Sequence, residues 1–149
     1  MSEQVVKETF ESLFAANPKR RLIIATFASN VYRIQQIINI AAKDKRKGAM
    51  SGRSMINVTE AAAKIGEMII PDGVLVDIDK IKNIQDKDIV IISTGSQGEP
   101  MSALTRMASD DHSQVKIGPN DTIIISASPI PGNEKSIYNV INNLYRKGA

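Results

Sequence analysis

The most constraining feature of this chain is a short β-branched run that ends in a glycine-rich corner. Residues 89–92 (IVII) lead into 94–98 (TGSQG), and Pro100 then suits the first turn of a helix. Such a run, bounded by turn signals, is typical of a strand buried on both faces of a parallel sheet. A strand, a glycine-rich turn and a helix start together favour phosphate binding, because backbone amides and the helix dipole attract anions. A tight turn alone would also explain these glycines.

Strand-like and helix-like segments alternate along the rest of the chain. Apolar runs predict strands at 21–27, 47–50, 74–76 and 122–127. Helical spacing predicts helices up to about residue 17, from 29 or 30, from 57 or 59 to about 68, over 101–109, and from about 134. Because no hairpin signal separates the apolar runs, alternation predicts one three-layer α/β domain over residues 1–149, with a mostly parallel sheet and helices on both faces.

Composition excludes several classes of protein. The chain has 149 residues, enough for one domain with a real core, and a formal charge of +3, which is compatible with a polyanionic partner. With no cysteine and one histidine, it cannot build a His- or Cys-rich zinc site by itself. No apolar run reaches membrane-spanning length, so we expect no membrane partner and a cytoplasmic location.

Polar corners follow four of the predicted strands. They are 26–30 (TFASN), 51–55 (SGRSM), 94–99 (TGSQGE) and 128–134 (SPIPGNE). Because parallel strands end at the same edge of a sheet, these corners predict one polar rim suited to phosphates. Arg33 would lie one turn into its helix, where a cation is unfavourable unless an anion is held nearby.

Simpler explanations exist for several of these residues. Ser29 and Asn30 fit ordinary helix caps, and Gly52 and Gly132 fit permissive backbone positions. Arg53 is different, because a cap does not need a guanidinium group, and its planar fork suits phosphate.

The remaining polar residues give no catalytic signature. His112 follows two aspartates and is interpreted as a surface or loop-bracing residue, and the charged run 43–47 is interpreted as a solvated face. No nucleophile–base pair, paired carboxylates or P-loop motif occurs. The sequence therefore indicates a phosphate-binding protein rather than a complete catalyst.

Four segments carry a family resemblance: 25–36 (ATFASNVYRIQQ), 51–55 (SGRSM), 93–104 (STGSQGEPMSAL) and 126–134 (SASPIPGNE). In this order and spacing they resemble the β-CASP domain of bacterial ribonuclease J. The resemblance implies a Rossmann-like fold inserted in a metallo-β-lactamase domain, with single-stranded RNA entering between the two. Proteins of this family are nucleases with 5′→3′ exonucleolytic and endonucleolytic activity.

The resemblance also implies that parts of the enzyme lie outside this chain. The family's HxHxDH and HxSGHA motifs do not occur here. We therefore expect an excised domain that lacks its metallo-β-lactamase partner, contributes no catalytic or metal-binding residue, and binds no cofactor itself. The two zinc ions would belong to the intact enzyme, which we expect to be a homo-oligomer.

The resemblance assigns the polar rim to RNA and phosphate contact. The predicted contact residues are Ser29, Asn30, Arg33, Ser51, Gly52, Arg53, Ser54, Thr94, Gly95, Ser96, Gln97, Gly98, Ser128, Gly132 and Asn133. Two alternatives remain open. The 93–99 segment (STGSQGE) also resembles the phosphosugar-binding loops of sugar isomerase domains, and a regulatory protein–protein domain is a third possibility.

Overall fold

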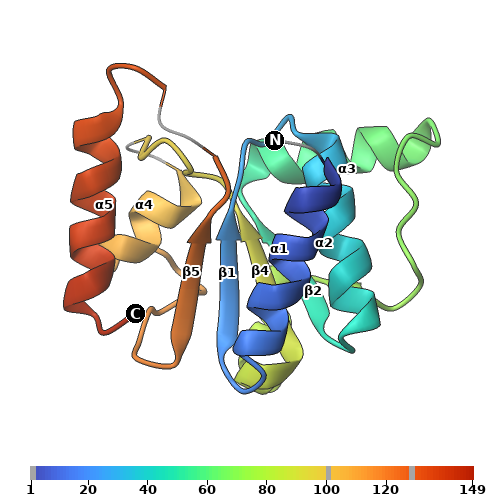
Figure 1. The fold of residues 1–149 in the computed structure, drawn as a ribbon, viewed down its shortest axis with the longest axis horizontal. Coiled ribbons are helices and arrows are strands. Elements are labelled where there is room, and N and C mark those ends of the chain that lie inside the picture. The colour runs from blue at the N-terminus through green and yellow to red at the C-terminus, as the bar shows by residue number, and fades with distance from the viewer. Residues whose placement is uncertain (1–2, 100–101, 128–129) are drawn as a thin grey trace.

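Strands and helices alternate along the computed structural model, which describes residues 3–99, 102–127 and 130–149 (Figure 1). The strands are β1 (Arg21–Ala25), β2 (Lys47–Ser51), β3 (Leu75–Val76), β4 (Ile89–Ser93) and β5 (Asp121–Ile125). The helices are α1 (Glu3–Ala16), α2 (Val31–Lys43), α3 (Arg53–Lys64), α4 (Ala103–Ala108) and α5 (Glu134–Arg146), with two 3-10 turns, η1 (Ile78–Asn83) and η2 (Asp86–Asp88).

The strands form one five-stranded sheet in the order β3-β2-β4-β1-β5, and every pair is parallel. In register, Ile23 of β1 lies beside Ile91 of β4 and Ile123 of β5. All five residues of β4 are buried, as the continuous apolar run predicts. The predicted α/β fold with a parallel sheet is confirmed.

Helices cover both faces of the sheet (Figure 1). On one face, α1, α2 and α3 pack against side chains that alternate along the central strands, including Leu22, Ile24, Val90 and Ile92. On the other face, α4, α5 and η1 pack against the intervening side chains, including Ile23, Ala25, Ile89 and Ile91. This period of two follows from strand geometry and gives the domain two apolar layers.

One boundary differs from its prediction in a way that affects the site. Helix α3 begins at Arg53, not at Asn57 or Thr59, and it ends at Lys64. Gly52 precedes it with φ +128°, a conformation that L side chains rarely adopt, so the chain turns into the helix directly after β2. Arg53 therefore lies in the first turn of a helix rather than in a loop. No helix in the described part of the chain has the length and apolar character needed to cross a membrane.

Candidate functional site

A cavity of about 900 Å³ opens at the carboxyl ends of β1, β2 and β4. The chain leaves β1 and β2 toward helices on one face of the sheet, and it leaves β4 toward the helices of the other face. Diverging connections of this kind open a crevice between neighbouring strands. The polar residues that line the cavity include Thr26, Ser51, Arg53, Ser54, Thr94 and Ser102.

Gly52 brings the β2–α3 turn against the end of β4. A Cβ atom at this position would lie 2.6 Å from the Thr94 Cγ2 atom, so a larger residue would push the two corners apart. The Thr94 amide also donates to the Ser51 carbonyl over 3.2 Å. The first amides of α3 precede its first backbone bond, from Ile56 N to the Gly52 carbonyl, so they are available to an anion at the cavity.

Arg53 supplies a positive charge at this helix start. Its side chain is exposed and lines the cavity. Within the described part of the chain, its guanidinium group makes no hydrogen bond or ion pair. The first turn of α3 holds no acidic residue that would offset a cation at the positive end of the helix dipole. An anionic ligand would remove this unfavourable arrangement.

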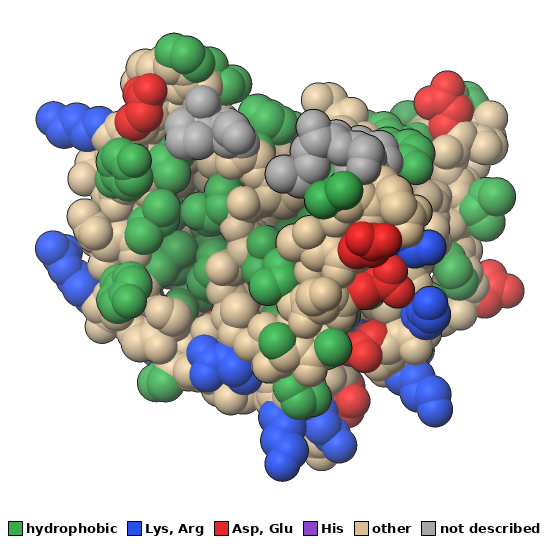
Figure 2. Space-filling view, in the orientation of Figure 1, with side chains coloured by type: hydrophobic (Ala, Val, Ile, Leu, Met, Phe, Trp, Pro, Cys, Tyr) green, Lys and Arg blue, Asp and Glu red, His purple; other side chains and the backbone are tan. Residues whose placement is uncertain are grey.

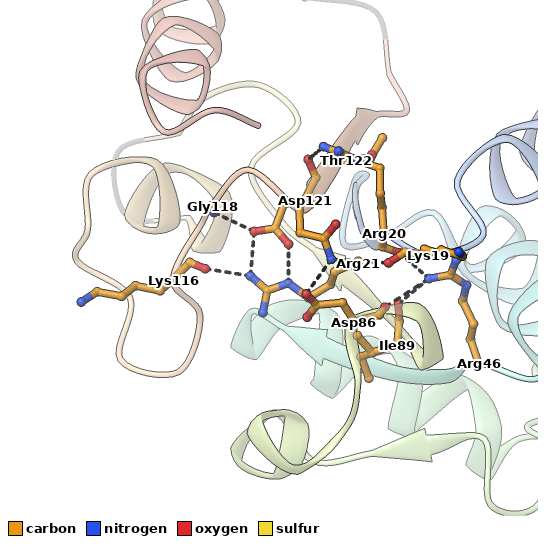
Figure 3. Close-up of polar contacts among 11 residues, drawn as sticks. Lys19, Arg20, Arg21, Arg46, Asp86, Ile89, Lys116, Gly118, Asp121 and Thr122 are labelled. Atoms are coloured by element: carbon orange, nitrogen blue, oxygen red, sulfur yellow. Dashed lines mark hydrogen bonds and ion pairs between the residues drawn. The ribbon is translucent and has the colours of Figure 1, made fainter.

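The arginines at the opposite, amino-terminal edge of the sheet are paired (Figure 3). Arg21 donates to both carboxylate oxygens of Asp121, with Nε to Oδ1 at 2.6 Å and Nη2 to Oδ2 at 2.8 Å. Asp121 Oδ2 also accepts from the Gly118 amide at 2.9 Å. This bidentate ion pair joins β1 to the start of β5, so these charges serve the fold.

Arg46 belongs to the same edge, and the interpretation of residues 43–47 as a solvated face is wrong for it. The residue is only 2% exposed. Its guanidinium group donates to the carbonyls of Arg20 at 2.8 Å and Ile89 at 3.0 Å (Figure 3). It also donates to the Asn17 carbonyl at 2.7 Å. It makes a longer bond of 3.4 Å to the Asp86 carbonyl, so one buried cation serves four backbone acceptors where several loops meet.

His112 reaches the cavity from the loop after α4. Its Nε2 atom lies 2.7 Å from the Ser51 Oγ atom at the end of β2. Its Nδ1 atom accepts from the amides of Gln114 and Val115, each at 3.1 Å. Burial, and to a lesser degree the nearby Arg106 cation, lowers the pKa of the imidazole below its ordinary value. The geometry agrees with the interpretation of His112 as a loop-bracing residue and adds a contact to a cavity hydroxyl.

Comparison with known proteins identifies the family. The model for the β-CASP domain of ribonuclease J matches residues 19–144. This chain belongs to the ribonuclease J β-CASP family.

Three relatives named ribonuclease J illustrate how the chain relates to longer proteins. It is 41% identical to the protein of Synechocystis sp., 43% identical to that of Corynebacterium glutamicum and 41% identical to that of Thermus thermophilus. Each match covers 99% of this chain but only 23%, 20% and 26% of the respective relative. The chain therefore spans about a quarter or less of the length of these proteins.

The structure of this β-CASP chain brings six of the predicted contact residues together around the cavity. They are Ser51, Gly52, Arg53, Ser54, Thr94 and Gly95. Gly95 has φ +107°, and a Cβ atom there would lie 2.6 Å from the Ser102 Oγ atom, so glycine allows the turn after β4 to close on α4. These residues come from the corners after β2 and β4, which lie side by side in the sheet.

The other half of the 94–98 corner is buried. Ser96, Gln97 and Gly98 are not among the residues that line the cavity. Gln97 Oε1 accepts from the Ile130 amide at 2.7 Å and from Asn133 Nδ2 at 3.3 Å, so it ties this corner to the start of α5. The Ser96 Oγ atom is buried and has no hydrogen-bond partner in the described part of the chain.

Asn30 and Arg33 lie in a different groove, of about 540 Å³, between α1 and β5. Asn30 caps α2 by accepting from the Arg33 amide at 3.0 Å. Arg33 Nη1 donates to Ser126 Oγ at 2.6 Å, and the guanidinium group lies 5.9 Å from the centre of the Phe10 ring. This groove is largely apolar, and Figure 2 shows hydrophobic side chains gathered over β5 between α5 and α1.

Three further predicted residues lie away from both cavities. Ser29 is exposed just before α2. Gly132 is exposed as well, and the Gly132 amide donates to Glu134 Oε2 at 2.9 Å. Asn133 is partly buried at the start of α5. Ser128 lies outside the described residues.

Several residues that line the cavity are absent from the predicted set, among them Thr26 and Arg106. Thr26 follows β1 as Thr94 follows β4, and its buried Oγ1 atom has no hydrogen-bond partner among the described residues. Its position directly after an apolar run was the available signal. Arg106, on α4, carried no such signal, because it lies in a helix rather than a corner.

The donor set does not fit a metal centre. Within residues 3–99, 102–127 and 130–149, no group of three or more His, Cys, Asp or Glu side chains is arranged to hold a metal ion.

Proposed function

We propose that this chain is the RNA-binding and positioning domain of a ribonuclease J-type enzyme. The observation that carries this proposal is the unpaired Arg53 cation at the start of α3, inside a cavity formed by three strand ends. Family membership supports the same conclusion, because the relatives are named ribonuclease J.

The cavity groups suit a phosphodiester backbone. Arg53 would bind phosphate oxygens through its guanidinium fork, while the α3 amides and the hydroxyls of Ser51 and Thr94 would donate to them. Such contacts position a strand without reading its sequence. Aromatic residues make up only 4% of the chain, so base stacking would contribute little here.

Hydrolysis would belong to the rest of the protein. The intact enzyme would be a metal-dependent 5′→3′ exo- and endoribonuclease, with two zinc ions in its metallo-β-lactamase domain. This chain would pack against that domain, hold the RNA, and contribute neither metal ligands nor a catalytic group. We further propose a cytoplasmic homo-oligomer, as the resemblance implies.

Titration of this chain with a short single-stranded RNA tests the proposal. We expect Arg53→Ala to weaken binding about tenfold, because a hydrogen bond to a charged group contributes roughly 1.5–3 kcal/mol. The slope of log affinity against log salt should become shallower by about 0.7. Arg146→Ala is the matched control, since it removes the same charge from an exposed position at the far end of α5.

The phosphosugar alternative predicts a different result. A sugar-phosphate pocket would saturate with one small ligand and show a weaker dependence on salt. Stabilisation of the fold by a sugar phosphate, without binding of RNA, would overturn the proposed function. Equal RNA affinity of the Arg53→Ala and Arg146→Ala variants would remove Arg53 from the site.

A further inference from the structure

The side chain of His112 is held at both ring nitrogens. On one side, the amides of Gln114 and Val115 both point at Nδ1 from 3.1 Å. On the other side, Nε2 lies 2.7 Å from Ser51 Oγ. An amide N–H can only donate, so Nδ1 must be the unprotonated acceptor of two hydrogen bonds. A neutral imidazole then carries its single proton on Nε2 and donates it to Ser51.

This arrangement uses one of the two acceptor lone pairs of the Ser51 hydroxyl group. A serine hydroxyl ordinarily rotates to donate or to accept as its surroundings require. Here one lone pair of Oγ is occupied by the His112 proton. Within the described residues, no acceptor receives the hydroxyl's own hydrogen. Because Ser51 is 4% exposed and lines the cavity, the open direction for that hydrogen is toward a ligand.

We propose that His112 is a positioning residue of the cavity, which leaves the Ser51 hydroxyl hydrogen for the ligand and so favours an unprotonated ligand oxygen at that position. In this form the inference rests on the proposed RNA-binding function, where that oxygen belongs to a phosphodiester. A ligand group that can only donate, such as an ammonium, would have only the second Oγ lone pair to bind and would leave the hydroxyl hydrogen without an acceptor.

The charges around the cavity agree with an anionic acceptor. Arg53 from α3 and Arg106 from α4 line it, against one carboxylate, Glu99.

The alternative, that His112 only braces its loop, would require only the two amide contacts. It would not require Nε2 to lie within hydrogen-bond distance of a cavity hydroxyl.

Two substitutions separate the roles of His112. In His112→Asn, the amide oxygen can replace Nδ1 as the acceptor for Gln114 and Val115, but the shorter side chain cannot reach Ser51. We expect this variant to keep the fold and to lose about tenfold in affinity for a short single-stranded RNA. Ser51→Ala should lose a similar factor, and the double variant should lose no more than either single one, because both remove the same interaction. Ser113→Ala, an exposed change in the same loop, is the control.

A second readout does not depend on RNA. Because His112 is the only histidine of the chain, nitrogen NMR of the imidazole reports on it alone. We expect the Nε2–H tautomer at neutral pH in the wild type and in Ser113→Ala. An Nδ1–H tautomer would overturn the inference.

The two proposals fail in different ways. If the wild type binds RNA and Ser51→Ala weakens it while His112→Asn does not, the positioning role of His112 is overturned and RNA binding stands. If the wild type does not bind RNA at all, the proposed function and the phosphodiester assignment of the Ser51 acceptor are both overturned.

Discussion

Two arginines show how the same residue type serves the fold at one edge of the sheet and is available to a ligand at the other. Arg46 is buried and donates to four backbone carbonyls at the amino-terminal edge. Arg53 is exposed at the carboxyl edge and has no partner among the described residues. Arg46 also donates through Nε to the Asp44 carboxylate at 2.9 Å, so its donors are already engaged within the fold. Such a cation is poorly placed to hold a ligand, whereas an unpaired cation at a helix start favours one.

Arg46→Ala should therefore be a stability variant. It leaves the carbonyls of Asn17, Arg20 and Ile89 without their donor, and we expect a loss of about 3 kcal/mol in the free energy of unfolding. Denaturant unfolding measures this loss. Lys43→Ala, which changes an exposed charge in the same run, should stay within about 0.5 kcal/mol. Similar stability of the two variants would contradict the structural role of Arg46.

His112 should also make stability depend on pH. Burial and the Arg106 cation lower its pKa in the folded chain below the ordinary value of 6.5, so the unfolded chain binds the proton more readily. Its contribution is therefore fully present above the unfolded pKa and is lost as the pH falls through 6.5 toward the lower folded value. Comparing unfolding free energies of wild type and His112→Asn at about pH 7.5 and about pH 5.5 isolates this effect. A pH dependence that is the same in both proteins would contradict it.

Among the elements, glycines set how closely the corner between β4 and α4 approaches helix α5. Gly98 has φ +72°, and a Cβ atom there would lie 2.6 Å from the backbone carbonyl carbon of Ser136. Backbone atoms cannot move aside as the end of a flexible side chain can. The β4–α4 corner and α5 therefore depend on glycine for their contact, and the Gln97 hydrogen bonds hold the same two segments together.

Gly98→Ala should be much more destabilising than Gly66→Ala. Both positions have positive φ, but a Cβ atom at Gly66 would meet nothing within 4 Å. We expect about 1 kcal/mol for Gly66→Ala from backbone strain alone and about 3 kcal/mol for Gly98→Ala, where overpacking is added. Thermal or denaturant unfolding of both variants measures the difference. Equal losses would mean that α5 does not pack on Gly98 as described.

Most elements could be predicted because strands and helices have distinct apolar periods. The runs at 21–27 and 122–127 correspond to β1 and β5, and each strand ends two residues before its predicted end. The start of α3 could not be predicted, because the polar SGRSM segment resembles a loop. Only the contact between Gly52 and Thr94 shows why a helix begins there.

The sequence predicts that the polar corners meet at one edge of the sheet, but it does not predict which of them share a cavity. Arg33 and Arg53 both follow strand ends, yet they line different cavities. Which cavity a side chain enters depends on strand order and on the rotation of each helix, and neither is encoded by local periodicity. Strand order also puts β2 beside β4, which is what joins the corners of Arg53 and Thr94.

The most direct test of RNA binding at the carboxyl edge is to record, by NMR, how the backbone amide chemical shifts change when a short single-stranded RNA is added to this chain. We expect the largest changes at Gly52, Arg53, Thr94 and Gly95, which line the cavity, and a loss of these changes in high salt. Amides at the opposite edge, such as those of Arg46 and Asp121, should stay unchanged. Shifts confined to that edge, or to the groove at Arg33, would contradict the site proposed for RNA.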